Sequence, residues 1–233
     1  AGFLYASIDS TGQSDAYLYE LAAKQTTRLT RTPESEFSPT VIPEDSAFSC
    51  VRVEADSSQR LWRFPMDGAP PGVILPDVKP VGYHTWVATS TLALFILGQP
   101  NTLELVHAVN GDRHHLADSP GRSIHRIPTR NAVSYIDKTK EDEWWIMRVD
   151  MAAQKSYPII PTLLGSEDMI WIGPNSILMS QKNKLVRWVA KDGHLHNWTN
   201  VAVFTEPELS SITRMALSPD RQWLAVVSGE PAP

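Results

Sequence analysis

The chain has one cysteine and none of the common catalytic sequence motifs. Cys50 is the only cysteine among 233 residues, so no disulfide can form within the chain. It lies in an apolar, strand-like segment, and we expect a buried, unreactive thiol there rather than a catalytic one. The G-x-S-x-G nucleophile elbow, the P-loop, the dinucleotide-binding fingerprint, H-E-x-x-H and paired-cysteine zinc motifs are all missing. These absences argue against a peptidase domain with a nucleophile elbow and against nucleotide chemistry.

Composition argues against two kinds of partner. No apolar run approaches the roughly 18 residues that a membrane-spanning helix needs. The formal net charge is −5, whereas a nucleic-acid partner requires a basic face. We therefore expect no transmembrane segment and no nucleic-acid partner.

What the chain does contain is a repeat of strand-like segments. A segment rich in aromatic and β-branched residues recurs about every 40 residues, at 17–21, 60–64, 102–106, 144–149 and 184–189. A second segment precedes each copy, at 3–7, 47–53, 92–97, 132–136 and 176–180, with a last copy at 223–227. A period of about 40–45 residues with only strands inside the unit is typical of a β-propeller. The sequence predicts one all-β domain over 1–233, with repeats at approximately 1–33, 34–76, 77–119, 120–163, 164–206 and 207–233.

The two ends of the chain carry incomplete repeats. A propeller blade is a four-stranded antiparallel meander. The first repeat supplies only the last three strands of a blade, and the last repeat supplies only the first two. We expect a six-bladed propeller that lacks about three N-terminal strands; the alternative is a five-bladed ring with one strand left over. Open blade edges of this kind also favour self-association.

Three short phrases resemble a known repeat. Arg28-Leu29-Thr30, Ser38-Pro39-Thr40 and Ser218-Pro219-Asp220 each stand at a fixed blade position and resemble the repeat of the TolB-like (WD40-like) propeller family. The resemblance is closest in the first, second and last repeats and is degenerate in the third to fifth. It implies a propeller used for protein binding in the bacterial envelope, or a non-catalytic domain beside a peptidase. A periplasmic or secreted location in a bacterium follows from the resemblance, but no chemistry does.

Polar residues gather at one station of the repeat. His84 and His125 lie one repeat period apart, each in the segment that begins the first strand of a blade. Equivalent positions of successive blades face the same central channel, and Glu36, Asp168 and Arg214 lie near this station. We expect these five residues to bind a ligand at the channel mouth. His84, His125, Glu36 and Asp168 are the candidate ligands of a divalent metal such as calcium or zinc. The alternative is that these side chains close the channel mouth and bind water or one another.

A second polar set lies in the second blade. Arg52 and Glu54 share one face of a strand, and Arg60 and Arg63 lie on the next strand. Cross-strand ion pairing is the favoured interpretation, and the alternative is a clamp for an anionic group.

The sequence favours a non-catalytic propeller that binds a protein or small ligand at its channel mouth. The alternative is a metal-dependent hydrolase, lactonase-like or esterase-like, whose His/Glu/Asp ring would hold a cation that activates water. A third hypothesis is a glycan-processing propeller with Glu36 and Asp168 as its two carboxylates.

Overall fold

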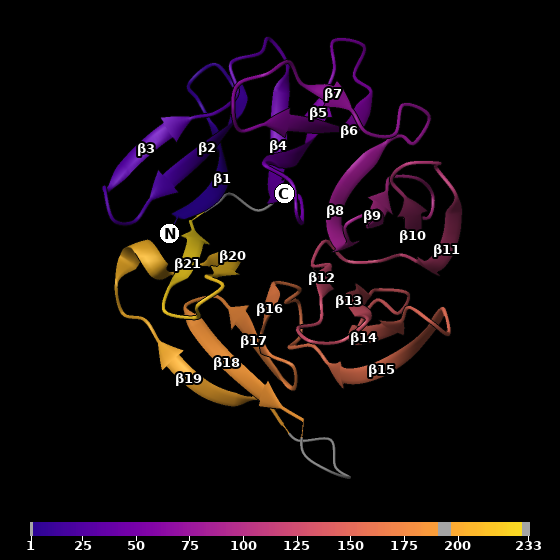
Figure 1. Cartoon of the computed structure of the whole chain (residues 1–233). Helices are drawn as coiled ribbons and strands as arrows, with labels where there is room; N and C mark the ends of the chain where they lie inside the picture. The colour runs from indigo at the N-terminus through magenta and orange to yellow at the C-terminus, as the bar shows by residue number, and fades with distance from the viewer. Residues whose placement is uncertain (1, 191–196, 230–233) are drawn as a thin grey trace. The chain divides into compact units, whose positions relative to one another are not determined.

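The protein is built almost entirely of strands. The computed structural model describes residues 2–190 and 197–229, and in that part the one helical segment is the 3₁₀ turn η1 (Pro207–Leu209) (Figure 1). The prediction of an all-β chain is confirmed. No helix in the described residues has the length and apolar character needed to cross a membrane.

The chain folds as two compact units, Ala1–Ser119 and Pro120–Pro233, and each is described by itself. The described part of the first unit holds three antiparallel sheets (Figure 1). The first sheet contains β1 (Gly2–Ile8), β2 (Ser14–Glu20) and β3 (Gln25–Arg28). The second contains β4 (Ser35–Val41), β5 (Ala47–Val53), β6 (Gln59–Pro65) and β7 (Gly72–Val73). The third contains β8 (Val81–Ala88), β9 (Thr91–Ile96), β10 (Thr102–His107) and β11 (Arg113–Asp118).

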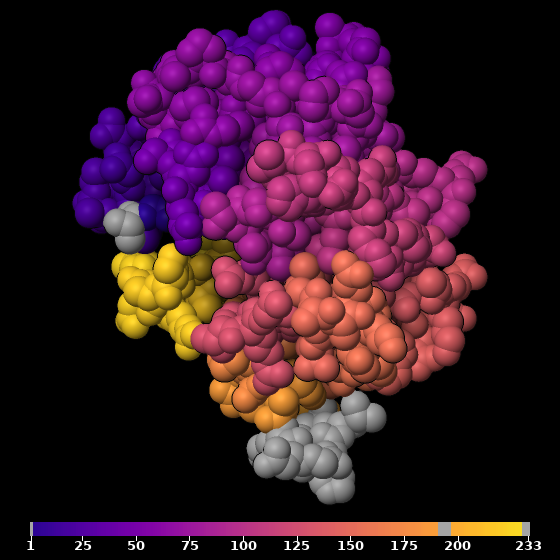
Figure 2. Space-filling model, turned by 45° about the vertical axis from the view of Figure 1, so that its right-hand side comes forward, coloured from indigo at the N-terminus to yellow at the C-terminus, as the bar shows by residue number. Residues whose placement is uncertain are grey.

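The described part of the second unit also holds three antiparallel sheets. One contains β12 (His125–Arg126), β13 (Ala132–Asp137), β14 (Trp145–Asp150) and β15 (Lys155–Pro161). The next contains β16 (Met169–Gly173), β17 (Ser176–Gln181), β18 (Lys184–Val189) and β19 (Thr199–Val203). The last has two strands, β20 (Ile212–Leu217) and β21 (Leu224–Ser228). Figure 2 shows, in salmon, the surface formed around β15, the outer strand of its sheet.

Each four-stranded sheet is a meander, because its neighbouring strands are consecutive in the chain and pair antiparallel. This is the blade of a β-propeller, and the predicted fold is confirmed. Of the two blade counts that the sequence left open, the structure matches five. Among the described residues four sheets are complete blades, and the end sheets of three and two strands are each too small to be a blade alone.

The second strand of each complete blade is the most deeply buried element. β5, β9, β13 and β17 have buried side chains along nearly their whole length. They read as continuous apolar runs, rather than alternating ones, because both faces of the strand are packed. Leu61, Leu94 and Val106 belong to one core in the first unit, and Ile136 and Met179 to another in the second. Cys50 in β5 is fully buried, as predicted.

Candidate functional site

The His84 imidazole lies in a buried cluster that joins two blades of the first unit. His84 is on β8 and is 7% exposed. Its Nε2 lies 2.7 Å from the Oγ atom of Ser49 on β5, in the preceding blade. The indole Nε1 of Trp86 donates to the same Oγ at 2.9 Å, and the Ser49 hydroxyl lies 3.3 Å from the carbonyl oxygen of Thr40. We call these four residues the Ser49 cluster.

The hydrogen bonds of the Ser49 cluster fix the tautomer of His84. A serine hydroxyl offers one donor and two acceptor sites. All three contacts are satisfied if Ser49 donates to Thr40 and accepts from both Trp86 and His84, so His84 carries its proton on Nε2. Its Nδ1 is then an unprotonated acceptor, which has no hydrogen-bond partner among the described residues. Burial lowers the pKa of His84 to about 3, because the charged ring would lose its hydration, and the ring is neutral near pH 7.

Glu36 on β4 is also engaged inside the first unit. Its side chain is 0% exposed; Oε1 accepts a hydrogen bond from Thr32 and lies 3.4 Å from Nε of Arg52. Arg52 is shared, because it also forms an ion pair with Glu34. Burial raises the pKa of Glu36, while the Thr32 hydrogen bond and the Arg52 charge oppose that rise.

The predicted ion pairing in this blade is present, with a change of partners. Glu54 pairs with Arg60 across β5 and β6, and Glu54 also accepts the indole N–H of Trp62 at 2.9 Å. Arg52 instead turns toward β4 and the loop before it, to Glu34 and Glu36. The two arginines are thus held by carboxylates of the same blade.

His125 takes the corresponding place in the second unit. His125 on β12 lies opposite Ser134 on β13, as His84 lies opposite Leu94 on β9. Each histidine is therefore on the first strand of its blade, opposite the second strand, as the repeat predicts. Burial lowers the pKa of His125 to about 4, and a hydrogen bond with the backbone of Met169 opposes this shift.

Asp168 and Arg214 are in one ion network of the second unit. Nη2 of Arg122 lies 2.8 Å from Oδ2 of Asp168, and Nη1 of Arg214 lies 3.5 Å from Oδ1 of the same carboxylate. Glu167 accepts from the backbone N–H of Arg122 at 3.0 Å and lies 3.6 Å from Nζ of Lys138. Burial raises the pKa of Asp168, and the Arg122 and Arg214 charges oppose it.

The structure therefore places Asp168 beside Arg214. It gives Glu36 and His84 separate sets of partners inside the first unit. That all five residues face one channel mouth stays a prediction. In residues 2–190 and 197–229 no three His, Cys, Asp or Glu side chains are grouped so that they could hold a metal ion.

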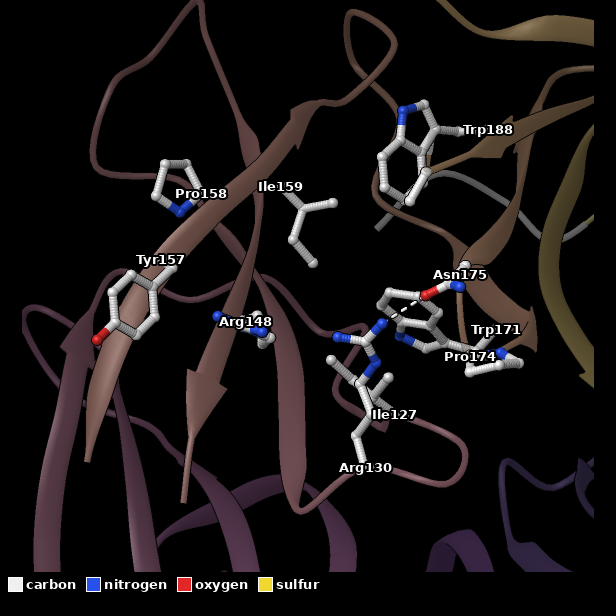
Figure 3. Close-up of a pocket in the computed structure, with 11 residues that line it drawn as sticks. Ile127, Arg130, Arg148, Tyr157, Pro158, Ile159, Trp171, Pro174, Asn175 and Trp188 are labelled. Carbon is white, nitrogen blue, oxygen red and sulfur yellow. Dashed lines mark hydrogen bonds between the residues drawn. The ribbon is translucent and has the colours of Figure 1, made fainter. Parts of the chain in front are cut away.

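The second unit contains a cavity of about 240 Å³ that the sequence did not predict. Its walls come from the β12–β13 turn, β14, β15, β16, the β16–β17 turn and β18 (Figure 3). It lies between the blade formed by β12–β15, which we call blade D, and the blade formed by β16–β19, which we call blade E, and we call it the D/E cavity. The lining residues are Ile127, Arg130, Arg148, Tyr157, Pro158, Ile159, Trp171, Pro174, Asn175, Trp188 and Ala190.

Two guanidinium groups, those of Arg130 and Arg148, line the D/E cavity on its blade D side (Figure 3). Arg130 donates to the side-chain carbonyl of Asn175, and the Arg148 guanidinium lies 5.2 Å from the ring centroid of Tyr157. The Trp171 indole on the opposite side donates to Ser134 Oγ at 2.8 Å, which fixes the orientation of the ring. In the sequence the cavity is marked just by Arg148, a charged residue in the otherwise apolar segment 144–149. The repeat pattern explains that segment as a strand and does not indicate a cavity.

Comparison with known proteins identifies the fold and leaves the family open. No family model matches the chain, and no curated protein matches it. Among solved structures, a chain of a nidogen/laminin complex matches with a TM-score of 0.69 and 12% identity, over 98% of this chain and 86% of that one. TolB from Acinetobacter baumannii matches with a TM-score of 0.60 and 11% identity, over 80% of this chain and 48% of TolB.

A third similar structure is an oligogalacturonate lyase in complex with manganese, with a TM-score of 0.58 and 13% identity, over 96% of this chain and 81% of that one. At this level of identity the likeness extends to the fold and not to the chemistry of a site. The chain is a β-propeller with structural similarity to TolB, as its short repeat phrases indicated.

Proposed function

We propose that this chain is a non-catalytic propeller that binds a protein or small ligand. The observation that carries the proposal is the D/E cavity, in which the apolar walls formed by Ile127 and two indoles surround the guanidinium groups of Arg130 and Arg148. A concave, mostly apolar site with a few polar groups is the usual form of a ligand site. A site at the channel mouth, formed by the five predicted residues, belongs to the same proposal.

The contacts of the acid and base candidates support a role without catalysis. His84 is held by Ser49, Glu36 by Thr32 and Arg52, and Asp168 by Arg122. A general base must reach the proton that it removes from a substrate, whereas these groups are engaged by neighbouring side chains. Protein binding is the role that the TolB-like resemblance implies, and one similar chain belongs to a nidogen/laminin complex. The TolB-like resemblance further leads us to propose a periplasmic or secreted location.

A ligand screen followed by thermal unfolding tests the binding proposal. Neutral, anionic and cationic small molecules and short peptides are added to the whole chain, and hits are titrated. We expect at least one class to raise the melting temperature in a saturable manner, because a ligand that binds only the folded state stabilises it. Trp171→Ala should weaken the hits, whereas Trp223→Ala, which removes an exposed indole outside the cavity, should not.

The hydrolase alternative is examined with the same protein. Ester and lactone turnover is measured after addition of calcium or zinc, for the wild type and for His84→Ala and His125→Ala. Metal-dependent turnover that both substitutions abolish would overturn the non-catalytic proposal. Absence of any saturable ligand would overturn the binding proposal.

A further inference from the structure

In the part of the chain that the structure describes, the two cations of the D/E cavity have no acidic partner. Arg122, Arg60 and Arg63 each form an ion pair with a carboxylate. Among the described residues Arg130 instead has the Asn175 amide, and Arg148 has the face of the Tyr157 ring. Neither contact neutralises a charge. The cavity thus carries two positive charges that no described carboxylate compensates, in a protein whose net charge is −5.

Most of the other side chains that line the cavity are apolar. Ile127 and Trp188 are buried, and Ile159 and Trp171 are partly buried. Trp171 is fixed from behind by its hydrogen bond to Ser134. An apolar cavity of about 150 Å³ accepts benzene, so a volume of about 240 Å³ leaves room for one ring and one small charged group.

We propose that the D/E cavity binds a carboxylate attached to an apolar or aromatic body, an inference that rests on the binding function proposed above. The planar guanidinium group matches a carboxylate in geometry and forms charge-assisted hydrogen bonds with it. The Asn175 oxygen orients Arg130 and the Tyr157 ring supports Arg148, so both forks are positioned before the ligand arrives. The apolar body of the ligand packs against Ile159 and the two indoles (Figure 3).

A carboxylate of this kind has two sources, a free organic acid and the C-terminal residue of a peptide. Four probes distinguish the effect of the carboxylate charge from the effect of the molecule that carries it. 3-Phenylpropionate is compared with its amide, and a tetrapeptide that ends in phenylalanine with a free carboxyl group is compared with its C-terminal amide. Binding to the whole chain is measured by isothermal titration calorimetry. Tryptophan fluorescence is a second readout, because Trp171 and Trp188 line the cavity.

We expect at least one free acid to bind and its amide to bind at least about 10-fold more weakly, the effect of losing a hydrogen bond between charged groups. Arg148→Gln and Arg130→Gln should each lower the affinity for the acid by a similar factor. Arg187→Gln is the matched control: it removes an exposed guanidinium from β18, beside Trp188 but outside the cavity, and should change the affinity less than about two-fold. Circular dichroism and the melting temperature establish that each variant is folded.

Arg148→Lys keeps the experiment decisive if Arg148→Gln does not fold, since lysine retains the charge and loses the planar fork. The lysine variant should bind the acid more weakly than the wild type and should lose affinity further as salt is raised. Equal binding of acid and amide, or wild-type affinity in the folded arginine variants, would overturn the carboxylate inference. Failure of all four probes would overturn it too, whereas the binding function itself is judged by the wider ligand screen.

Discussion

Ser49→Ala is expected to be among the most damaging small substitutions in the first unit. Ser49 is fully buried and accepts hydrogen bonds from two rings of the next blade, His84 at 2.7 Å and Trp86 at 2.9 Å. Alanine leaves both ring N–H groups buried without an acceptor. Each such group costs about 1–3 kcal/mol, so the free energy of unfolding should fall by roughly 2–6 kcal/mol.

Ser134→Ala is the matched control for this prediction. Ser134 is also fully buried, but it accepts from only one ring, the Trp171 indole at 2.8 Å. Ser134→Ala should therefore lower the free energy of unfolding by about half as much, roughly 1–3 kcal/mol. Urea unfolding of the two variants, followed by circular dichroism, gives both values. A Ser49→Ala variant within about 0.5 kcal/mol of the wild type, or one no worse than Ser134→Ala, would refute the hydrogen-bond assignment and the His84 tautomer that depends on it.

Three further expectations follow from buried groups. In the folded protein the pKa values of His84 and His125 are about 3 and about 4, below the value of about 6.5 in the unfolded chain. The unfolded state therefore binds more protons, and the free energy of unfolding should fall as the pH drops below about 6.5. The fall is at most about 1.4 kcal/mol per pH unit for each ring. His125→Leu should flatten this slope in urea unfolding at a series of pH values, and an unchanged slope contradicts the burial argument. Gly121→Ala should lower the free energy of unfolding by about 1–3 kcal/mol, because the added Cβ would lie 2.6 Å from a Glu167 oxygen. At Gly173 an added Cβ meets no atom within 4 Å, so Gly173→Ala should leave the melting temperature nearly unchanged. Cys50, whose thiol pKa is raised by burial, should react with a thiol reagent only as fast as the protein unfolds, and rapid native labelling would show an accessible thiol.

The blades could be predicted from the sequence because the signal is local. A strand packed on both faces must be apolar along its length, so 47–53 and 132–136 stand out, and β5 and β13 occupy those positions. Short outer and inner strands are less well defined. The outer strand β7 covers just Gly72–Val73, and the inner strand β12 covers just His125–Arg126. These strands have few buried side chains to mark their ends.

The partners of the site residues could not be predicted, because they depend on contacts between blades. The repeat places His84 and His125 on equivalent strands, and pairing with β9 and β13 agrees. The contact between Ser49 and the His84 ring depends on how one blade packs against the next. Residue spacing within a single blade carries no information about that packing. The D/E cavity was missed for the same reason: its walls come from six separate segments, and in the sequence each resembles an ordinary strand or turn.

One recurring contact connects the packing of the blades to the proposed binding site. In both units a tryptophan on the first strand of a blade donates its indole N–H to a buried serine on the second strand of the preceding blade, and the two residues are 37 positions apart each time: Trp86 with Ser49, and Trp171 with Ser134. The serine is a polar residue in a largely apolar strand, and the indole explains its presence, since a buried N–H needs an acceptor. In the first unit Ser49 also forms a hydrogen bond with His84, and the His84 and Trp86 rings are buried. In the second unit Trp171 lines the D/E cavity, so this structural bond fixes one wall of the cavity before a ligand binds and reduces the ordering cost of binding.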